Sequence, residues 1–168
     1  MEKEKLLNYI APCSLLCSTC MAYKGGPVTE CAKRLQVYCE GMCEFLSQNQ
    51  SEEDRKNTRA FFDNFNAALW NLSGGSCHGC RSDSDQKGGC LSGCVVPECV
   101  KEHGIDFCAE CNEFPCQKAK EFFGSVGGSL DKVWEVGSRR IREVGIETYY
   151  DEKKDVSHYL HYKKNKTE

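Results

Sequence analysis

Residues 76–116 constrain the fold of this chain more than any other stretch. They contain eight of its fourteen cysteines and almost no aliphatic periodicity, so apolar burial cannot be what orders them. Two kinds of cross-link can order such a segment: disulfides, or metal ions bound by thiolates. The choice between them depends on the redox compartment in which the chain folds.

The N-terminus favours a reducing compartment. The stretch "MEKEKLLNYIAP" carries charges where a secretory signal peptide would carry an apolar run, and no later stretch is long and apolar enough to cross a membrane. We therefore expect a cytoplasmic protein with reduced thiols. Disulfide scaffolds are also usually shorter and richer in loops than this chain of 168 residues. Metal thiolates are the favoured interpretation.

The spacing of the cysteines is typical of metal-binding knuckles. C-x2-C pairs occur at Cys17 and Cys20, at Cys77 and Cys80, and at Cys108 and Cys111. Two intervening residues allow a tight turn that aims both sulfurs at one ion, and Gly79 eases that turn in the second pair. The predicted metal ligands are Cys13, Cys17, Cys20, Cys77, Cys80, Cys90, Cys94, Cys99, Cys108, Cys111 and Cys116.

The thiols within residues 76–116 are enough for two tetrahedral four-thiolate sites. One grouping joins Cys77 and Cys80 to two of Cys90, Cys94 and Cys99. A second site would then consist of Cys108, Cys111 and Cys116, completed by Cys13, Cys17 or Cys20. Spacing alone does not determine the grouping. His78 and His103 lie near the thiols but are interpreted as non-ligands.

Zinc is the favoured metal because C-x2-C knuckles predominate and a loop-rich region needs structural closure. The alternative is an iron–sulfur or thiol-redox protein that uses "CSLLCSTC" at Cys13–Cys20, whose C-x3-C-x2-C spacing holds a four-iron cluster in radical-SAM enzymes. The chain is too short for the barrel of those enzymes. Thr19 also occupies the position before the last cysteine, where their loops usually carry an aromatic residue.

The other segments predict a mainly α fold with little β structure. A short helix over "EKEKLLNYI" precedes a helical pair at about residues 29–73. Its first helix, with Thr29 as N-cap, has an apolar stripe formed by Cys31, Leu35, Tyr38, Met42 and Phe45. Its second helix begins after Ser51, ends at Gly74, and has a stripe formed by Phe61, Phe62, Phe65, Leu69 and Leu72. We expect an antiparallel hairpin in which Cys31, Cys39 and Cys43 are small buried residues.

Further helices are expected at Pro97–His103 and over about residues 115–145, beginning at Pro115. The last of them, capped by Ser129, has one face formed by Leu130, Val133, Trp134, Gly137, Ile141 and Val144, and a polar tail follows. We predict a single domain, 1–168, in which these helices and the pair at 29–73 pack on Cys-rich, metal-stabilised segments at 11–22 and 76–116.

Charge and motifs exclude several functions. The net charge of −3 becomes more negative once thiolates bind a metal, which disfavours a zinc-dependent nucleic-acid-binding module. The chain has no nucleophile elbow, P-loop, zinc-protease helix or dinucleotide fingerprint, so no catalytic residue is assigned. A binding or interaction role toward a protein or small molecule is the remaining expectation.

Four stretches together resemble a known prokaryotic pattern: "IAPCSLLCSTCMAY", "CHGCR", "CVVPECVKEHGIDFCAECNEFPC" and "RRIREVGIETYY". The chain resembles the Cys-rich family called domain of unknown function 3795 (DUF3795) over nearly its whole length. The resemblance implies a zinc-binding role without an established activity, and it implies as ligands Cys13, Cys17, Cys20, Cys77, Cys80, Cys94, Cys99, Cys108, Cys111 and Cys116. Members of the family commonly carry Gly after the first of these cysteines, where this chain has Ser14.

Overall fold

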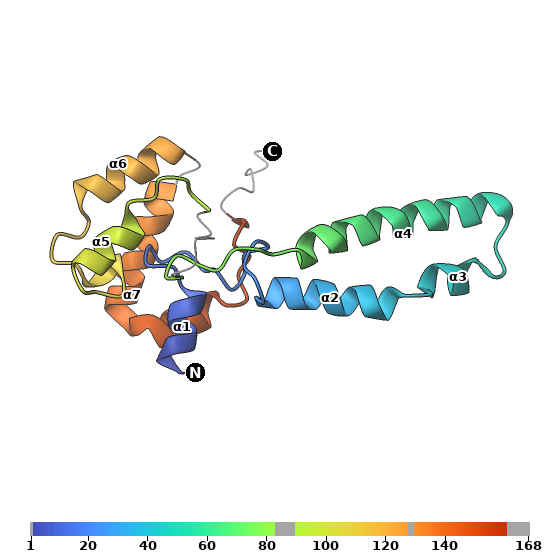
Figure 1. Cartoon of the computed structure of the whole chain (residues 1–168), viewed down its shortest axis with the longest axis horizontal. Helices are drawn as coiled ribbons and strands as arrows, with labels where there is room; N and C mark the ends of the chain where they lie inside the picture. Colours follow the sequence, from blue (N-terminus) through green and yellow to red (C-terminus); the bar gives the residue numbers. More distant parts are fainter. Residues whose placement is uncertain (1, 83–89, 128–129, 161–168) are drawn as a thin grey trace, which may run out of the picture. The chain divides into compact units, whose positions relative to one another are not determined.

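The computed structural model describes residues 2–82, 90–127 and 130–160. Within these ranges the elements are helices (Figure 1). Ile10 and Leu16 form an isolated antiparallel bridge. The helices are α1 Lys3–Tyr9, α2 Pro27–Cys39, α3 Met42–Ser47, α4 Glu52–Ser73, α5 Val96–Glu102, the 3-10 turn η1 Cys108–Glu110, α6 Gln117–Val126 and α7 Leu130–Lys153. The predicted mainly helical fold is confirmed. None of the described helices is both long and apolar enough to cross a membrane.

The chain divides into two compact units. We call residues 1–20 and 77–168 the cysteine unit, because all of the predicted metal ligands belong to it. Residues 21–76 form the hairpin unit. That both units belong to one domain stays a prediction.

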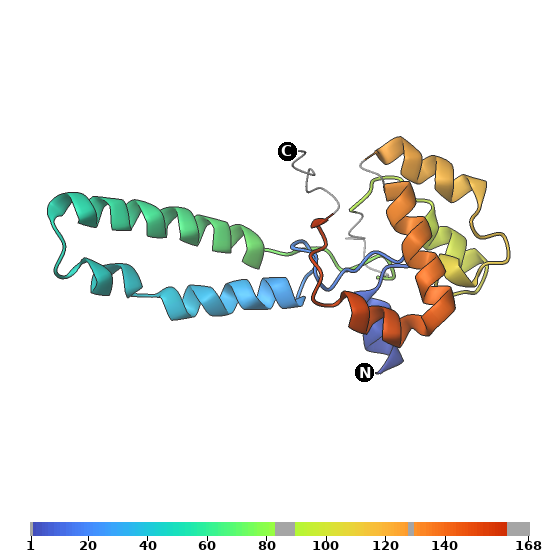
Figure 2. The same cartoon turned by 180° about the vertical axis from the view of Figure 1, so that it is seen from behind.

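The hairpin unit consists of α2 and α3 running antiparallel to α4, as both Figure 1 and Figure 2 show. Ser51 is the N-cap of α4, as predicted: its hydroxyl accepts a hydrogen bond from the Asp54 N–H at 3.2 Å. The helix ends at Gly74, also as predicted. The predicted N-cap of the first helix is wrong, because α2 already begins at Pro27 and Thr29 lies inside it.

The predicted stripe of the first helix does not form a core. The helix breaks after Cys39, and Gly41, with φ of 71°, separates α2 from α3. The residues of α2 that are buried in the hairpin are Thr29 and Ala32, opposite Phe62 and Leu69 of α4. The stripe residues Leu35, Tyr38, Met42 and Phe45 are exposed, and so is Cys31, for which burial was expected. Cys39 and Cys43 are partly buried.

The cysteine unit packs around Trp134 of α7, which is 1% exposed. Its indole stacks on Phe123 of α6 with centroids 5.5 Å apart and meets Phe114 edge-on at 5.3 Å. The buried face of α7 is formed by Leu130, Trp134, Gly137, Ser138 and Ile141, which agrees with the predicted face. The expected cap, Ser129, lies outside the described residues.

Two predicted helix boundaries near the C-terminus are wrong. The helix expected to begin at Pro115 begins at Gln117, with Cys116 as its N-cap. The expected polar tail after Val144 is instead a continuation of α7, which bends at Gly145 and buries two tyrosines, Tyr149 and Tyr150. The positive φ of 79° at Gly145 explains the bend, because only glycine adopts it without strain. The short helix α5, followed by Gly104, agrees with the prediction.

Ser14 and Gly137 approach each other closely in the cysteine unit. Ser14 has φ of 70°, and its hydroxyl donates a hydrogen bond to the Trp134 carbonyl at 3.3 Å, while Tyr149 donates to the Ser14 carbonyl at 2.8 Å. The left-handed conformation of Ser14 agrees with the glycine that the family commonly carries there. Because Gly137 has no side chain, the Cys13–Cys20 loop can lie directly against α7.

Replacing Gly137 by alanine is therefore expected to destabilise the protein. The added Cβ would lie 2.9 Å from the Tyr149 hydroxyl oxygen and even closer to the Ser14 hydroxyl. Overpacking of this kind costs about 1–3 kcal/mol of the free energy of unfolding. Urea denaturation measures the change, and Gly124→Ala is the control, because no atom of the described residues lies within 4 Å of its added Cβ. An unchanged midpoint for Gly137→Ala would contradict the close contact.

Candidate metal-thiolate sites

Four cysteines line one small cavity in the cysteine unit. They are Cys99, Cys108, Cys111 and Cys116, and the rest of the wall consists of Val100, Ile105, Phe114 and Trp134. The cavity measures about 20 Å³, which is room for a single small atom or water molecule. Its four sulfurs are thiols that form no disulfide. The cavity thus joins four thiols and no other polar side chain except the Trp134 indole.

This set differs from the grouping expected from the sequence. The fourth thiol beside Cys108, Cys111 and Cys116 is Cys99, and not a thiol of the Cys13–Cys20 loop. Cys99 lies in the middle of α5, and Cys108 is the first residue of η1. Burial raises the pKa of Cys108 to about 11, and the neighbouring charges of Cys116, Cys99 and Cys111 act in the same direction. These thiols are therefore close enough to influence one another's ionisation.

The Trp134 indole is the polar group beside this set. Its Nε1 is buried and, among the residues that the structure describes, has no hydrogen-bond partner that meets the usual geometric limits. Burial raises the pKa of Cys108, and the approach of the Trp134 N–H opposes that rise, because an N–H donor favours the thiolate form of the sulfur. The sequence placed Trp134 on an apolar helix face but gave no sign of this second role.

The remaining predicted ligands form a second group. Its members are Cys13, Cys17, Cys20, Cys77, Cys80, Cys90 and Cys94. Burial raises the pKa of Cys80 to about 12, and the charges of Cys90 and Cys94 add to the rise. Burial likewise raises the pKa of Cys17, again with a contribution from Cys80. Three separate chain segments therefore bring their thiols into one neighbourhood.

The knuckle at Cys77 and Cys80 has the expected backbone. Gly79 has φ of 84°, a conformation that glycine adopts freely, and its N–H donates to the Cys77 sulfur at 3.4 Å. N–H donation to sulfur is a common feature of thiolate knuckles, because it stabilises negative charge on the sulfur. The predicted role of Gly79 in the turn between Cys77 and Cys80 is therefore confirmed.

Arg81 holds the same knuckle in place. Its guanidinium donates hydrogen bonds to the carbonyl oxygens of Leu7, Ile10 and Asp106, and it lies 4.7 Å from the centroid of the Phe107 ring. Burial lowers the pKa of Arg81, although the group stays charged at neutral pH. Arg81 follows directly after Cys80, and this adjacency is the only sign of its role that the sequence contains.

Arg142 has a matching role at the other knuckle. It donates from Nε to the Ala109 carbonyl at 2.6 Å and from Nη2 to the Cys111 carbonyl at 2.8 Å. Its guanidinium also lies 5.1 Å from the centroid of the Phe114 ring. The loop between Cys108 and Cys111 is therefore attached to α7 by an arginine, as the loop after Cys80 is attached to α1.

The described side chains do not form a finished coordination site. Among residues 2–82, 90–127 and 130–160, no three His, Cys, Asp or Glu side chains are arranged so that they could hold a metal ion. The structure brings the predicted ligands into two groups, of four and of seven thiols, without fixing their sulfurs in a tetrahedron. Metal binding by these two groups of thiols therefore stays a prediction.

Fold and composition define the class: a mainly helical, cysteine-rich protein whose thiols gather in one of its two units. The family described as "Protein of unknown function (DUF3795)" matches residues 9–121, which is more than half of the chain. The chain belongs to this family. Comparisons with curated proteins and with solved structures gave no match.

Proposed function

We propose that the cysteine unit binds zinc through thiolates, with Cys99, Cys108, Cys111 and Cys116 as one complete site. The observation that carries this proposal is that four thiols line a single small cavity with room for one small atom. Tetrahedral zinc takes four thiolates at about 2.3 Å. Rotation about the single side-chain bond of each cysteine changes the sulfur position without moving the backbone.

The surroundings of the four thiols suit a structural rather than a catalytic metal. A site with four protein thiolates leaves no open position for substrate or water. The buried Trp134 N–H, which has no other partner, would donate to the Cys108 thiolate. Bound zinc would cross-link α5, η1 and the residue that precedes α6, and would tie these short elements together beside the core around Trp134.

The second group, with seven thiols, would hold further metal. Seven thiols are more than the four that one tetrahedral ion requires. Either two ions would share some of these thiolates, or one ion would bind four of the seven. An iron–sulfur cluster at Cys13, Cys17 and Cys20 is the competing occupant, since both metals accept tetrahedral thiolates. In the zinc account the protein is a cytoplasmic binding module, with a protein or a small molecule as its partner and no catalytic residue.

Cobalt substitution tests the proposed four-thiolate site. Zinc-depleted protein titrated with Co²⁺ under argon is expected to develop the visible absorption of tetrahedral cobalt thiolates. Cys99→Ser should lower the absorbance at saturation by the contribution of one bound Co²⁺. Cys31→Ser changes an exposed cysteine of the hairpin unit and should leave the absorbance unchanged. An equal saturating absorbance for Cys99→Ser and the unmodified protein would refute the assignment of Cys99.

Replacing Trp134 by phenylalanine is expected to weaken zinc binding by roughly 10- to 100-fold, the range observed when a supporting hydrogen bond to a metal ligand is removed. Phenylalanine keeps the ring stack but lacks the N–H. Competition with a chromophoric chelator measures the affinity. The control is Trp70→Phe, because Trp70 is 73% exposed on the hairpin unit. Equal affinities for the two variants would show that the Trp134 N–H does not support the metal.

A further inference from the structure

One side of the hairpin unit is apolar and exposed. We define the apolar face as Cys31, Leu35 and Tyr38 of α2 together with Phe61, Phe65 and Leu72 of α4. Leu35, Tyr38 and Phe61 are 44%, 73% and 62% exposed, whereas Phe65 and Leu72 are partly buried. Phe61 and Phe65 stack with parallel rings 6.0 Å apart, so the aromatic part of the face is ordered without any covering element among the described residues. Side chains of this size are seldom left in water as a continuous patch.

Helix geometry places these residues on one side of the hairpin. Successive residues of a helix turn by about 100°, so Leu35 and Tyr38 lie on the flank of α2 next to the buried Ala32. Phe61 and Phe65 lie on the corresponding flank of α4, next to the buried Phe62. Because the two helices run antiparallel, both flanks are turned to the same side.

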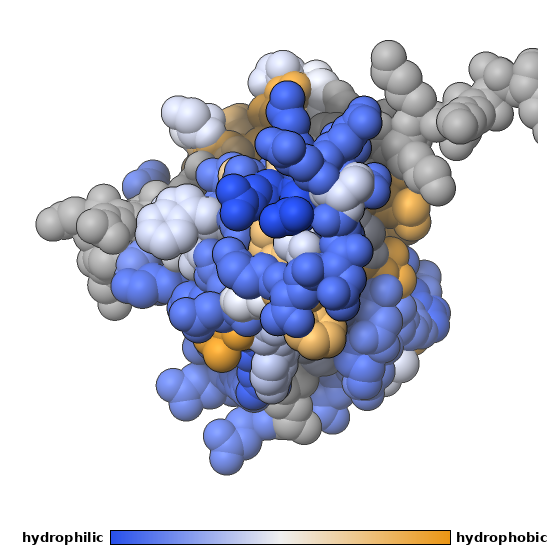
Figure 3. Space-filling model, turned by 90° about the vertical axis from the view of Figure 1, so that its right-hand side faces the viewer, coloured by the Kyte–Doolittle hydropathy of each residue, from blue (hydrophilic) through white to orange (hydrophobic). Residues whose placement is uncertain are grey.

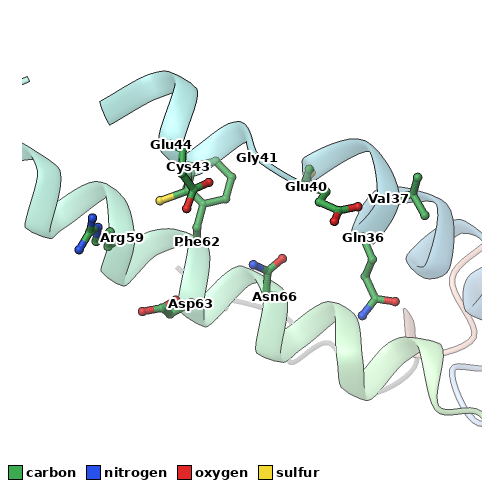
Figure 4. Close-up of a pocket in the computed structure, with 11 residues that line it drawn as sticks. Gln36, Val37, Glu40, Gly41, Cys43, Glu44, Arg59, Phe62, Asp63 and Asn66 are labelled. Atoms are coloured by element: carbon green, nitrogen blue, oxygen red, sulfur yellow. The ribbon is translucent and has the colours of Figure 1, made fainter. Parts of the chain in front are cut away.

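The opposite side of the hairpin is mainly polar, although Val37 is exposed there. A cavity there is lined by residues of all three helices, among them Gln36, Glu40, Arg59, Asp63 and Asn66 (Figure 4). No residue of the apolar face lines this cavity. The tip of the hairpin, which faces the viewer in Figure 3, is also largely hydrophilic. The apolar side chains of the face are therefore gathered on one side.

The chemistry of the face limits what can cover it. Its six residues include no charged side chain, and the hairpin unit as a whole has nearly equal numbers of acidic and basic residues. A nucleic acid or an acidic peptide would find no complementary charge. A complementary partner would present an uncharged apolar strip on a helical surface about as long as α4. The apolar face of a second copy of this chain is such a surface.

The exposed area is of the size that a dimer requires. The three large exposed side chains contribute on the order of 100 Å² each, and the partly buried Phe65 and Leu72, Cys31 and the rim bring the face toward the roughly 800 Å² that each partner buries in a standard interface. Two hairpins joined by these faces would form a four-helix arrangement with a shared apolar centre. The isolated hairpin buries few large side chains, chiefly Phe62 and Leu69.

We propose that the protein self-associates as a twofold dimer through the apolar face of the hairpin unit. In such an isologous interface each copy contributes the same surface, so Leu35 and Tyr38 of one copy cover the phenylalanine strip of the other. This inference is independent of the metal sites, which belong to the cysteine unit. It assigns a structural role to the hairpin unit.

Size-exclusion chromatography with light scattering, on the full metal-loaded chain at micromolar to high micromolar concentrations, tests the proposal. The expected mass is twice the 18.9 kDa of one chain, falling to one chain for Leu35→Glu and for Phe61→Glu. The matched control is Val37→Glu on the other flank of α2, where Val37 is 68% exposed, and it should remain a dimer. Far-UV circular dichroism verifies that all variants keep their helices.

Three outcomes would overturn the proposal. A single-chain mass for the unmodified protein over the whole concentration range excludes a second copy as the occupant and leaves a different apolar partner. A dimer that survives both Leu35→Glu and Phe61→Glu places the interface elsewhere. Loss of the dimer in Val37→Glu as well, with helicity intact, shows that the interface is not confined to the apolar face.

Discussion

Replacing Cys111 by serine is expected to remove one zinc ion per chain and to unfold much of the cysteine unit. Structural zinc contributes about 10–16 kcal/mol in small metal-binding domains, which is comparable to the whole stability of an ordinary domain. A serine hydroxyl does not replace a thiolate at such a site. The helices of the hairpin unit lie in the other compact unit and should retain part of their helical signal.

Elemental analysis and circular dichroism on heating measure both effects of Cys111→Ser. Cys77→Ser should act in the same way on the second group of thiols. Cys31→Ser is the matched control, because Cys31 is exposed and belongs to the hairpin unit. If Cys111→Ser kept its full metal content and melted cooperatively at the original temperature, Cys111 would not be a ligand.

Replacing Arg81 by methionine is expected to lower the free energy of unfolding by roughly 3 kcal/mol. Methionine keeps the packing on the Phe107 ring but removes charge-assisted hydrogen bonds to the Leu7, Ile10 and Asp106 carbonyls. Hydrogen bonds to charged groups contribute about 1.5–3 kcal/mol each, and the bonds of one guanidinium are not additive.

Urea denaturation at saturating zinc measures the loss of unfolding free energy in Arg81→Met separately from any loss of bound metal. The control is Arg139→Met, since Arg139 forms an exposed ion pair with Glu135 on one helix, worth less than about 0.5 kcal/mol. A midpoint for Arg81→Met equal to that of Arg139→Met would show that the Arg81 hydrogen bonds do not hold the knuckle.

Local signals in the sequence predicted the helices well where the signal was unambiguous. Ser51 before an acidic turn and Gly74 after an apolar stripe marked both ends of α4. Periodicity failed for α2, because a stripe such as Leu35 and Tyr38 shows that one side is apolar but not whether that side meets α4. Small residues, Thr29 and Ala32, allow the close approach of the two helices instead.

The grouping of the thiols could not be read from spacing. Cys99 lines one cavity with Cys108, Cys111 and Cys116 because the fold brings these separate segments together, and no local signal in the sequence marks such tertiary proximity. The roles of Arg81 and Arg142 depend likewise on carbonyl oxygens far away in the chain. The tail after Gly145 was expected to be polar, yet Tyr149 is buried because α7 bends and returns to the Ser14 loop.

Zinc binding by the thiols of the cysteine unit is tested most directly by elemental analysis together with an absorption spectrum, on protein purified without air. We expect about two or more zinc ions per chain and no visible absorption, since zinc thiolates are colourless. Iron with acid-labile sulfide and a brown absorption near roughly 400 nm would contradict it and make Cys13–Cys20 a cluster-binding loop.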